Sequence, residues 1–293
     1  MSKSSSHRPR RSLGQNFLVD GNIRRRIVEE VGIRPHDTVL EIGPGQGALT
    51  DLLVEEAERL ILVELDRDLA ARLRQRFADR ASVEVVEGDI LKLPLETLVA
   101  EPESLRVVGN IPYNITTPIV FHLLTAPRPA DILLMAQKEV ADRILAEPGT
   151  GDFGALTVGV QAVAEVERVL HVSPGAFRPR PKVDSAVIRI RPLRPPPLTA
   201  EEETGLRTLT RALFQWRRKQ LRKTLGSHPD LRLSTGRVGA LLAAAGAEPT
   251  QRPETVAPDG FVAMARLLAE YLPGDGTSLP GPSASQKRGA DGQ

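Results

Sequence analysis

The sequence of 293 residues predicts an α/β domain followed by a smaller all-α domain. Short apolar segments rich in β-branched residues alternate with helix-like segments as far as residue 190. A glycine-rich turn follows the first of these strands, which is typical of βαβ units that bind nucleotides. A stiff proline-rich segment, 191–197, then separates this part from segments that have helical periodicity alone.

Composition excludes several classes of protein. The chain is 41% hydrophobic, so it can bury a core, but no apolar run approaches the ~20 residues of a membrane span. The absence of cysteine excludes disulfides and thiolate metal sites and is typical of a reducing cytosol, so we expect a cytoplasmic protein without a metal centre. Residues 1–11 are expected to be a disordered basic arm, with a short organellar leader as the alternative, and 273–293 a disordered tail.

The first predicted βαβ unit contains the glycine-rich turn. A strand at Val39–Ile42 leads into Gly43-Pro44-Gly45-Gln46-Gly47. The second strand, 59–63, ends at Glu64, 21 positions after Gly43, where an acidic residue is expected to hold a ribose diol; a solvated acid is the alternative. The G-x-G-x-G spacing favours S-adenosylmethionine, which has no phosphate, although this spacing alone leaves NAD open.

Five more strands complete the predicted sheet, which we expect to be mostly parallel with an antiparallel edge hairpin. They are expected at 83–86, 105–108, 131–136, 166–172 and 185–190. The last two lack a helix between them, which indicates the hairpin. The strand at 83–86 leads to Asp89, whose carboxylate could accept a hydrogen bond from an adenine amine; the alternative is a loop aspartate that caps the next turn.

The remaining pattern sets the domain boundaries. We expect the sheet domain at 12–192, a linker at 193–199 and the helical domain at 200–272. Helices are predicted there at 201–214, 217–225, 238–245 and 258–271. The segment at 12–20 is polar and turn-like, and it either folds over the cofactor mouth or forms an N-terminal strap.

The fourth strand runs into Asn110-Ile111-Pro112-Tyr113, a turn that can hold the exocyclic amine of an adenine. The lone pair of this amine is delocalised into the ring. Two acceptors, one for each N–H, would draw the nitrogen towards tetrahedral geometry and aim the lone pair at an activated methyl group. The Asn110 side chain offers one acceptor, and the extended backbone before proline projects the carbonyl of Ile111 or Pro112 as the other. Tyr113 offers a flat face for stacking. An ordinary strand-to-helix turn is the alternative for this tetrapeptide taken alone.

Together with motifs elsewhere, these residues resemble the KsgA/RsmA family of small-subunit rRNA adenine dimethyltransferases, relatives of the Erm large-subunit rRNA methyltransferases. The matching segments are 13–18, 41–50, 64–66, 88–89, 110–115, 137–143 and 177–185. The resemblance implies a Rossmann-like class I methyltransferase sheet, S-adenosylmethionine as cofactor, and dimethylation of two adjacent adenines near the 3′ end of 16S rRNA in an immature small subunit. It implies a cofactor site lined by Asn16, Leu18, Gly43, Glu64, Asp89 and Asn110, and we expect Gly45 of the same glycine turn to line it too. It also implies that the target adenine is held by Asn110, Ile111, Pro112 and Tyr113.

The second domain favours the small-subunit branch, because Leu213–Lys223 resembles a C-terminal signature that Erm enzymes generally lack. Seven cations within 17 residues, with Trp216 among them, suit an RNA backbone and a stacking aromatic, although a solvated helix face is the alternative. The predicted RNA-binding residues are Arg207, Arg211, Arg217, Arg218, Lys219, Arg222 and Lys223.

We therefore predict an rRNA adenine dimethyltransferase whose partner is 16S rRNA in the small ribosomal subunit. Three alternatives stay open: an Erm-type 23S rRNA methyltransferase, a non-catalytic rRNA-binding assembly factor, and an NAD-dependent oxidoreductase. Nothing in the sequence demands more than a monomer, and no membrane partner is expected.

Overall fold

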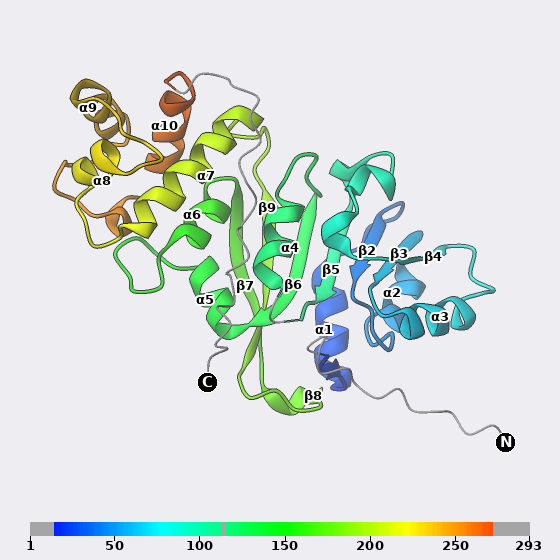
Figure 1. Cartoon of the computed structure of the whole chain (residues 1–293). Helices are drawn as coiled ribbons and strands as arrows, with labels where there is room; N and C mark the ends of the chain where they lie inside the picture. The colour runs from blue at the N-terminus through cyan, green and yellow to red at the C-terminus, as the bar shows by residue number, and fades with distance from the viewer. Residues whose placement is uncertain (1–14, 113–114, 272–293) are drawn as a thin grey trace, which may run out of the picture.

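The computed structural model describes residues 15–112 and 115–271. The predicted arm at 1–11, the predicted tail at 273–293 and Tyr113 lie outside the described residues. Figure 1 shows a twisted sheet with helices on both faces and a further set of helices beyond one edge. Within the described ranges, no helix is both long and apolar enough to cross a membrane.

The main sheet has seven strands in the order β4-β3-β2-β5-β6-β9-β7. Its strands are β2 (Thr38–Ile42), β3 (Arg59–Glu64), β4 (Val83–Glu87), β5 (Arg106–Asn110), β6 (Asp131–Gln137), β7 (Ala164–Val172) and β9 (Ser185–Pro192). Strands β2 to β6 pair in parallel, whereas β9 is antiparallel to both β6 and β7. The predicted mostly parallel sheet with an antiparallel hairpin is confirmed, and the hairpin returns β9 between β6 and β7.

Alternate residues of the strands divide the core into two apolar layers. On one face, Leu62 and Val108 pack in a layer with α1 (Gly21–Val31), α2 (Thr50–Glu56) and α3 (Arg67–Arg76). On the other face, Val63 and Val107 pack in a layer with α4 (Thr116–Leu123), α5 (Lys138–Ile144) and α6 (Ala155–Gln161). Because both faces of the central strands are covered, polar side chains that can meet a ligand are confined to the strand ends.

The helices beyond the sheet edge are α7 (Ala200–Gln215), α8 (Leu221–Ser227), α9 (Thr235–Ala244) and α10 (Pro258–Ala269). Apolar side chains from all four belong to the same buried cluster as the α4–α6 layer. Glu203 of α7 also forms an ion pair with the buried Arg128, from the segment before β6. The domain boundary at 193–199 stays a prediction, because the buried core is continuous across it.

The helix predicted at 217–225 begins later in the structure. α7 ends at Gln215, and a turn follows in which the Lys219 N–H donates to the Trp216 carbonyl at 2.8 Å. α8 then begins at Leu221, whose N–H donates to the Gln251 carbonyl at 2.8 Å. A tertiary hydrogen bond therefore replaces the one that a continuous helix would have made, and periodicity alone cannot reveal such a partner.

The N-terminal segment forms a second, two-stranded sheet. β1 (Phe17–Leu18) pairs antiparallel with β8 (Phe177–Arg178), which lies in the connection between β7 and β9. The Val19 N–H continues the pairing by donating to the Ala176 carbonyl at 2.8 Å. The segment predicted to be turn-like therefore contains a short strand, and it is tied to a loop far away in the sequence.

Candidate active site

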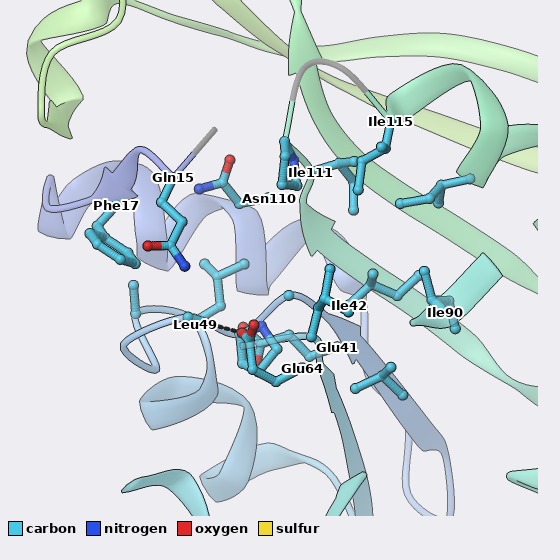
Figure 2. A pocket seen from close by; sticks show the side chains of 18 of the residues that line it. Gln15, Phe17, Glu41, Ile42, Leu49, Glu64, Ile90, Asn110, Ile111 and Ile115 are labelled. Carbon is cyan, nitrogen blue, oxygen red and sulfur yellow. Dashed lines mark hydrogen bonds between the residues drawn. The ribbon is translucent and has the colours of Figure 1, made fainter. Parts of the chain in front are cut away.

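One cavity lies at the carboxyl ends of β2, β3, β4 and β5. Every described residue of the predicted cofactor and adenine sites lines it: Asn16, Leu18, Gly43, Gly45, Glu64, Asp89, Asn110, Ile111 and Pro112. The strand order explains this convergence, because β2 lies between β3 and β5 and parallel strands bring their carboxyl ends to one edge. Figure 2 shows Asn110 and Ile111 on the opposite side of the cavity from Glu41 and Glu64.

The turn after β2 has a left-handed backbone that requires glycine. Gly43, Gly45 and Gly47 have φ values of +65°, +60° and +83°. A Cβ at Gly45 would lie 3.1 Å from the Phe17 ring, whereas nothing lies within 4 Å of a Cβ at Gly43. The turn therefore presents bare backbone to the cavity, with an aromatic ring packed against one of its residues.

Glu64 ends β3 with its carboxylate at the cavity. Its Oε2 accepts from the Gly45 N–H at 2.9 Å, and its Oε1 accepts from the Asp66 N–H at 2.8 Å. Burial raises the pKa of Glu64, while these two hydrogen bonds act in the opposite direction. Each carboxylate oxygen has a further lone pair, so Glu64 can accept both hydroxyl hydrogens of a ribose diol. The residues present at this strand end therefore fit the nucleoside part of S-adenosylmethionine.

Glu41 is a second acid at the cavity, which the sequence analysis did not single out. It lies on β2 with only 2% of its surface exposed, and Thr50 Oγ1 donates to its Oε2 at 2.6 Å. Burial raises the pKa of Glu41 to about 8; the Thr50 bond opposes the rise and the charge of Glu64 adds to it. An acid inside an otherwise apolar strand was the signal that could have identified it, because burying a charge is costly.

Asp89 follows β4, and it has features of both roles predicted for it, a cap of the next turn and a residue of the ligand site. Its Oδ1 accepts from the Leu91 N–H at 3.1 Å and caps the short 3₁₀-helix Ile90–Lys92. Asp89 also lines the cavity beside Ile90. Capping engages one carboxylate oxygen and leaves the other, 3.9 Å from Lys92 Nζ, for a ligand.

Asn110 is the last residue of β5, and the N-terminal segment orients its side chain. Asn110 Nδ2 donates to the Asn16 carbonyl at 3.1 Å. This bond leaves Asn110 Oδ1 available as an acceptor, since the amide has one oxygen and one nitrogen.

The backbone after Asn110 distinguishes the two carbonyls that the sequence left open. The Pro112 carbonyl accepts from the Ile115 N–H at 3.1 Å and from Thr116 Oγ1 at 3.4 Å. Pro112 is therefore engaged within the turn itself. The geometry favours the carbonyl of Ile111 as the second acceptor.

The N-terminal segment closes one side of the cavity. Gln15, Asn16, Phe17 and Leu18 all line it, and Gln15 Nε2 donates to Asp66 Oδ2 at 3.3 Å. The segment is thus both a strap, paired with β8, and a wall of the cavity. Gln15 and Phe17 were not predicted to line the cavity, because composition does not reveal which distant element a turn-like segment meets.

The seven cations predicted to bind RNA do not share one helix. They are distributed over α7 (Arg207, Arg211), the turn after it (Arg217, Arg218, Lys219) and α8 (Arg222, Lys223). Three of them face carboxylates: Arg207 with Glu203 at 3.8 Å, Arg211 with Asp230 at 3.0 Å and Arg217 with Glu254 at 3.9 Å. Density of positive charge along the sequence is therefore not the same as free positive charge on the surface.

Trp216 and its neighbours border a hollow on the protein surface. The hollow is lined by Gln215, Trp216, Arg217, Arg218, Lys219 and Lys223. The Trp216 ring is half-buried and lies edge-on to the His228 ring, with 4.9 Å between the ring centroids. Part of the indole is therefore used for packing, and the rest borders the basic hollow.

A model of the family described as ribosomal RNA adenine dimethylase matches residues 6–240. The chain is 45% identical to the ribosomal RNA small subunit methyltransferase A of Pseudomonas aeruginosa over 276 residues, which cover 94% of this chain and 100% of that protein. It is similar to the crystal structure of a dimethyladenosine transferase from Plasmodium falciparum, with a TM-score of 0.71, 26% identity, and coverage of 85% of this chain and 95% of that chain. It is also similar to that of the 23S rRNA methyltransferase ErmE, with a TM-score of 0.66, 33% identity, and coverage of 86% and 99%. On the evidence of its sequence and of its strand-end cavity, the chain belongs to the ribosomal RNA adenine dimethylase family.

Proposed function

We propose that this protein transfers methyl groups from S-adenosylmethionine to the N6 amines of two adjacent adenosines near the 3′ end of 16S rRNA, in the small ribosomal subunit during its biogenesis. The observation that carries this proposal is the position of Asn110 and Ile111 across one cavity from Glu64 and the glycine turn. The 45% identity to a small-subunit enzyme favours this substrate over 23S rRNA, because identity to ErmE is lower, at 33%. One chain supplies all the proposed groups, so a monomer acting on ribosomes in the cytoplasm is sufficient.

The proposed cofactor contacts follow from the chemistry of each residue. Glu64 accepts from the two ribose hydroxyls, and Asp89 accepts from the adenine amine through the oxygen that does not cap the 3₁₀-helix. Gly43 and Gly45 let the backbone approach the amino-acid part, while Asn16 and Leu18 line the cavity beside them. Bound S-adenosylmethionine supplies an electrophilic methyl group on a positively charged sulfur.

The target amine is held by two acceptors in this proposal. Asn110 Oδ1 and the Ile111 carbonyl each accept one N–H, and the bond from Asn110 Nδ2 to Asn16 orients the first acceptor before the substrate arrives. The nitrogen then forms its new bond to carbon as the sulfur–carbon bond breaks, and it loses one proton to water afterwards. Catalysis comes from positioning and electrostatics, without a covalent enzyme intermediate. The stacking role of Tyr113 stays a prediction, since it lies outside the described residues.

The basic hollow beside Trp216 is the proposed anchor for ribosomal RNA. Arg218, Lys219 and Lys223 line it, and none of the three pairs with a carboxylate in the described part of the chain. Cations in this state are the ones that can exchange bound counterions for RNA phosphates. The target adenosine must leave its base stack to enter the strand-end cavity, so an anchor elsewhere on the RNA also offsets part of that cost.

Methylation of unmethylated small subunits, followed by mass spectrometry of the product adenosines, tests the proposal. We expect N6,N6-dimethyladenosine at two adjacent positions of 16S rRNA. Label found only in 23S rRNA would establish the Erm-type alternative, and tight subunit binding without any methylation would establish the assembly-factor alternative. Stabilisation against heat by NAD, and not by S-adenosylhomocysteine, would contradict the cofactor assignment.

A further inference from the structure

We infer that a second basic surface, at the edge of the strand-end cavity, holds RNA phosphates that flank the target adenosine. We call this surface the rim. It consists of Arg24 and Arg25 of α1, Arg178 of β8, and Arg180 and Lys182 of the segment that joins β8 to β9. The inference rests on the proposed function, and the rim is separate from the basic hollow beside Trp216.

Residues 178–184 carry three of the rim cations, and the first end of this segment is fixed at the N-terminal wall of the cavity. Arg178 lies directly opposite Phe17 in the β1–β8 pair, and Phe17 lines the cavity. Figure 1 shows β8 beside α1, at the end of the sheet where α1 begins. Arg178 is therefore attached to the strap that orients Asn110.

The second end of the 178–184 segment is fixed beside the strand that carries Asn110. The Asp184 carbonyl accepts from the Lys138 N–H at 2.9 Å, where α5 begins at the end of β6. β6 is the parallel neighbour of β5, with Met135 in register with Asn110. Residues 178–184 therefore run from the N-terminal wall of the cavity to the end of β6, the strand next to the one that carries Asn110.

The two arginines of α1 extend the rim on the same side. A Cβ placed on Gly21 would lie 3.7 Å from a guanidinium nitrogen of Arg25 and 3.8 Å from one of Arg24. Both guanidinium groups thus gather over the first residue of α1, which follows the cavity-lining residue Leu18 by three positions. The five cations therefore come from two segments, each of which adjoins the β1–β8 pair beside the cavity-lining residues Phe17 and Leu18.

The charges of the rim are not neutralised by the protein. Within residues 15–112 and 115–271, none of the five cations pairs with a carboxylate, and Arg178, Arg180 and Lys182 are all exposed. Two acids close to the rim in sequence have other contacts: Asp20 caps α1, and Asp184 lies 3.5 Å from His171. Clustered cations repel one another, and the counterions they attract are released when a phosphate backbone takes their place.

The position of the rim gives it a role that the basic hollow cannot have. A flipped adenosine stays in the cavity only if the backbone on either side of it is held, because the reacting nitrogen must be placed to within about an ångström. The hollow is built from the α7–α8 turn, beyond the edge of the sheet, whereas Arg178 of the rim pairs with Phe17, which lines the cavity. The rim therefore places the nucleotide, and the hollow anchors the subunit.

The test compares two double variants that remove equal charge. Arg178→Gln/Arg180→Gln alters the rim, and Arg34→Gln/Arg80→Gln alters two exposed arginines elsewhere. The affinity of each protein for unmethylated small subunits is measured against KCl concentration, with S-adenosylhomocysteine affinity as the check on folding. Each phosphate contact with a single strand contributes about 0.7 to the slope of log K against log salt, so the rim variant should lose about 1.4 and bind about 25-fold more weakly at 0.1 M salt. The control should bind within about twofold of the unaltered protein.

Two measurements, of subunit binding and of photo-crosslinking, can overturn the inference. A rim variant that binds S-adenosylhomocysteine normally and matches the control in affinity and salt slope would contradict it. Failure of the unaltered protein to methylate small subunits would instead refute the proposed function, so the two failures are distinguishable. A photo-crosslinking residue in place of Arg180 should attach to nucleotides adjoining the dimethylated adenosines; attachment only to remote parts of the rRNA would also overturn the inference.

Discussion

The strand-end cavity and the basic α7–α8 region differ in how they gather their functional residues. In the cavity, Asn16, Glu64, Asp89 and Asn110 come from four separated segments and meet because the sheet brings strand ends together. In the α7–α8 region, the predicted residues are neighbours in sequence, yet the turn at 216–220 divides them and carboxylates face three of them.

The regular spacing of strand ends along the sequence predicts which residues meet in space, whereas a high density of cations along the sequence does not predict a shared binding surface. A parallel sheet turns regular spacing into spatial convergence, because every strand must end at one of two edges. A helical region gives no such guarantee, because tertiary contacts decide where a helix stops and which cations find partners. The comparison leads us to expect large effects from buried groups of the cavity and smaller effects from exposed groups of the α7–α8 region.

The largest effect is expected from Glu41→Gln. With a folded pKa of about 8 and an ordinary value of 4.5, Glu41 contributes stability that is lost as the pH rises from about 4.5 to about 8. The variant keeps an acceptor for Thr50 but does not titrate. The variant should therefore become more stable relative to the unaltered protein as the pH rises. Between pH 4.5 and pH 9, the difference between the two free energies of unfolding should shift in favour of the variant by up to about 5 kcal/mol, since one pKa unit corresponds to about 1.4 kcal/mol. Urea denaturation across this range measures it, and parallel pH profiles would contradict the burial of the charge.

Asn110→Ala should remove one of the two acceptors for the target amine. Loss of one preorganised hydrogen-bonding group typically lowers kcat by about 10²–10³-fold. Binding of S-adenosylhomocysteine, measured by calorimetry, should change much less. Unaltered methylation of small subunits by this variant would remove Asn110 from the proposed mechanism.

Glu64→Gln should weaken the cofactor and leave the adenine-holding turn intact. Hydrogen bonds to a charged group contribute about 1.5–3 kcal/mol, so the Kd for S-adenosylhomocysteine should rise by about 10–150-fold. Because burial raises the pKa of Glu64, affinity of the unaltered protein should fall as the pH falls through that raised value. The variant should lack this pH dependence, and an equal dependence in both proteins would assign it to another group.

The smallest effects separate two pairs of cations within the basic region. Arg218→Gln/Lys223→Gln removes charges that border the hollow, whereas Arg207→Gln/Arg211→Gln removes charges that face Glu203 and Asp230. The first pair should lower the salt slope of subunit binding by about 1.4, and the second should change it clearly less. If both pairs lowered the salt slope equally, the number of cations in this part of the sequence, and not their freedom from carboxylates, would govern RNA binding here.

The sequence by itself determined the architecture of the sheet and most of the cavity. Alternating strands and helices indicated a parallel sheet, and the strand ends at Gly43, Glu64, Asp89 and Asn110 indicated where a ligand would lie. These inferences were possible because hydrophobic periodicity and glycine turns are local properties, and the geometry of parallel strands then leaves little freedom for the residues that follow them.

Only the tertiary structure decided which groups complete the cavity and which charges are free. Gln15 and Phe17 reach it because β1 pairs with β8, and Glu41 becomes an acid with a raised pKa because both faces of β2 are buried. The choice between the Ile111 and Pro112 carbonyls likewise depends on a hydrogen bond from Ile115. Such features arise from contacts between segments that no local pattern records, and burial and hydrogen bonding exist only once those segments have met.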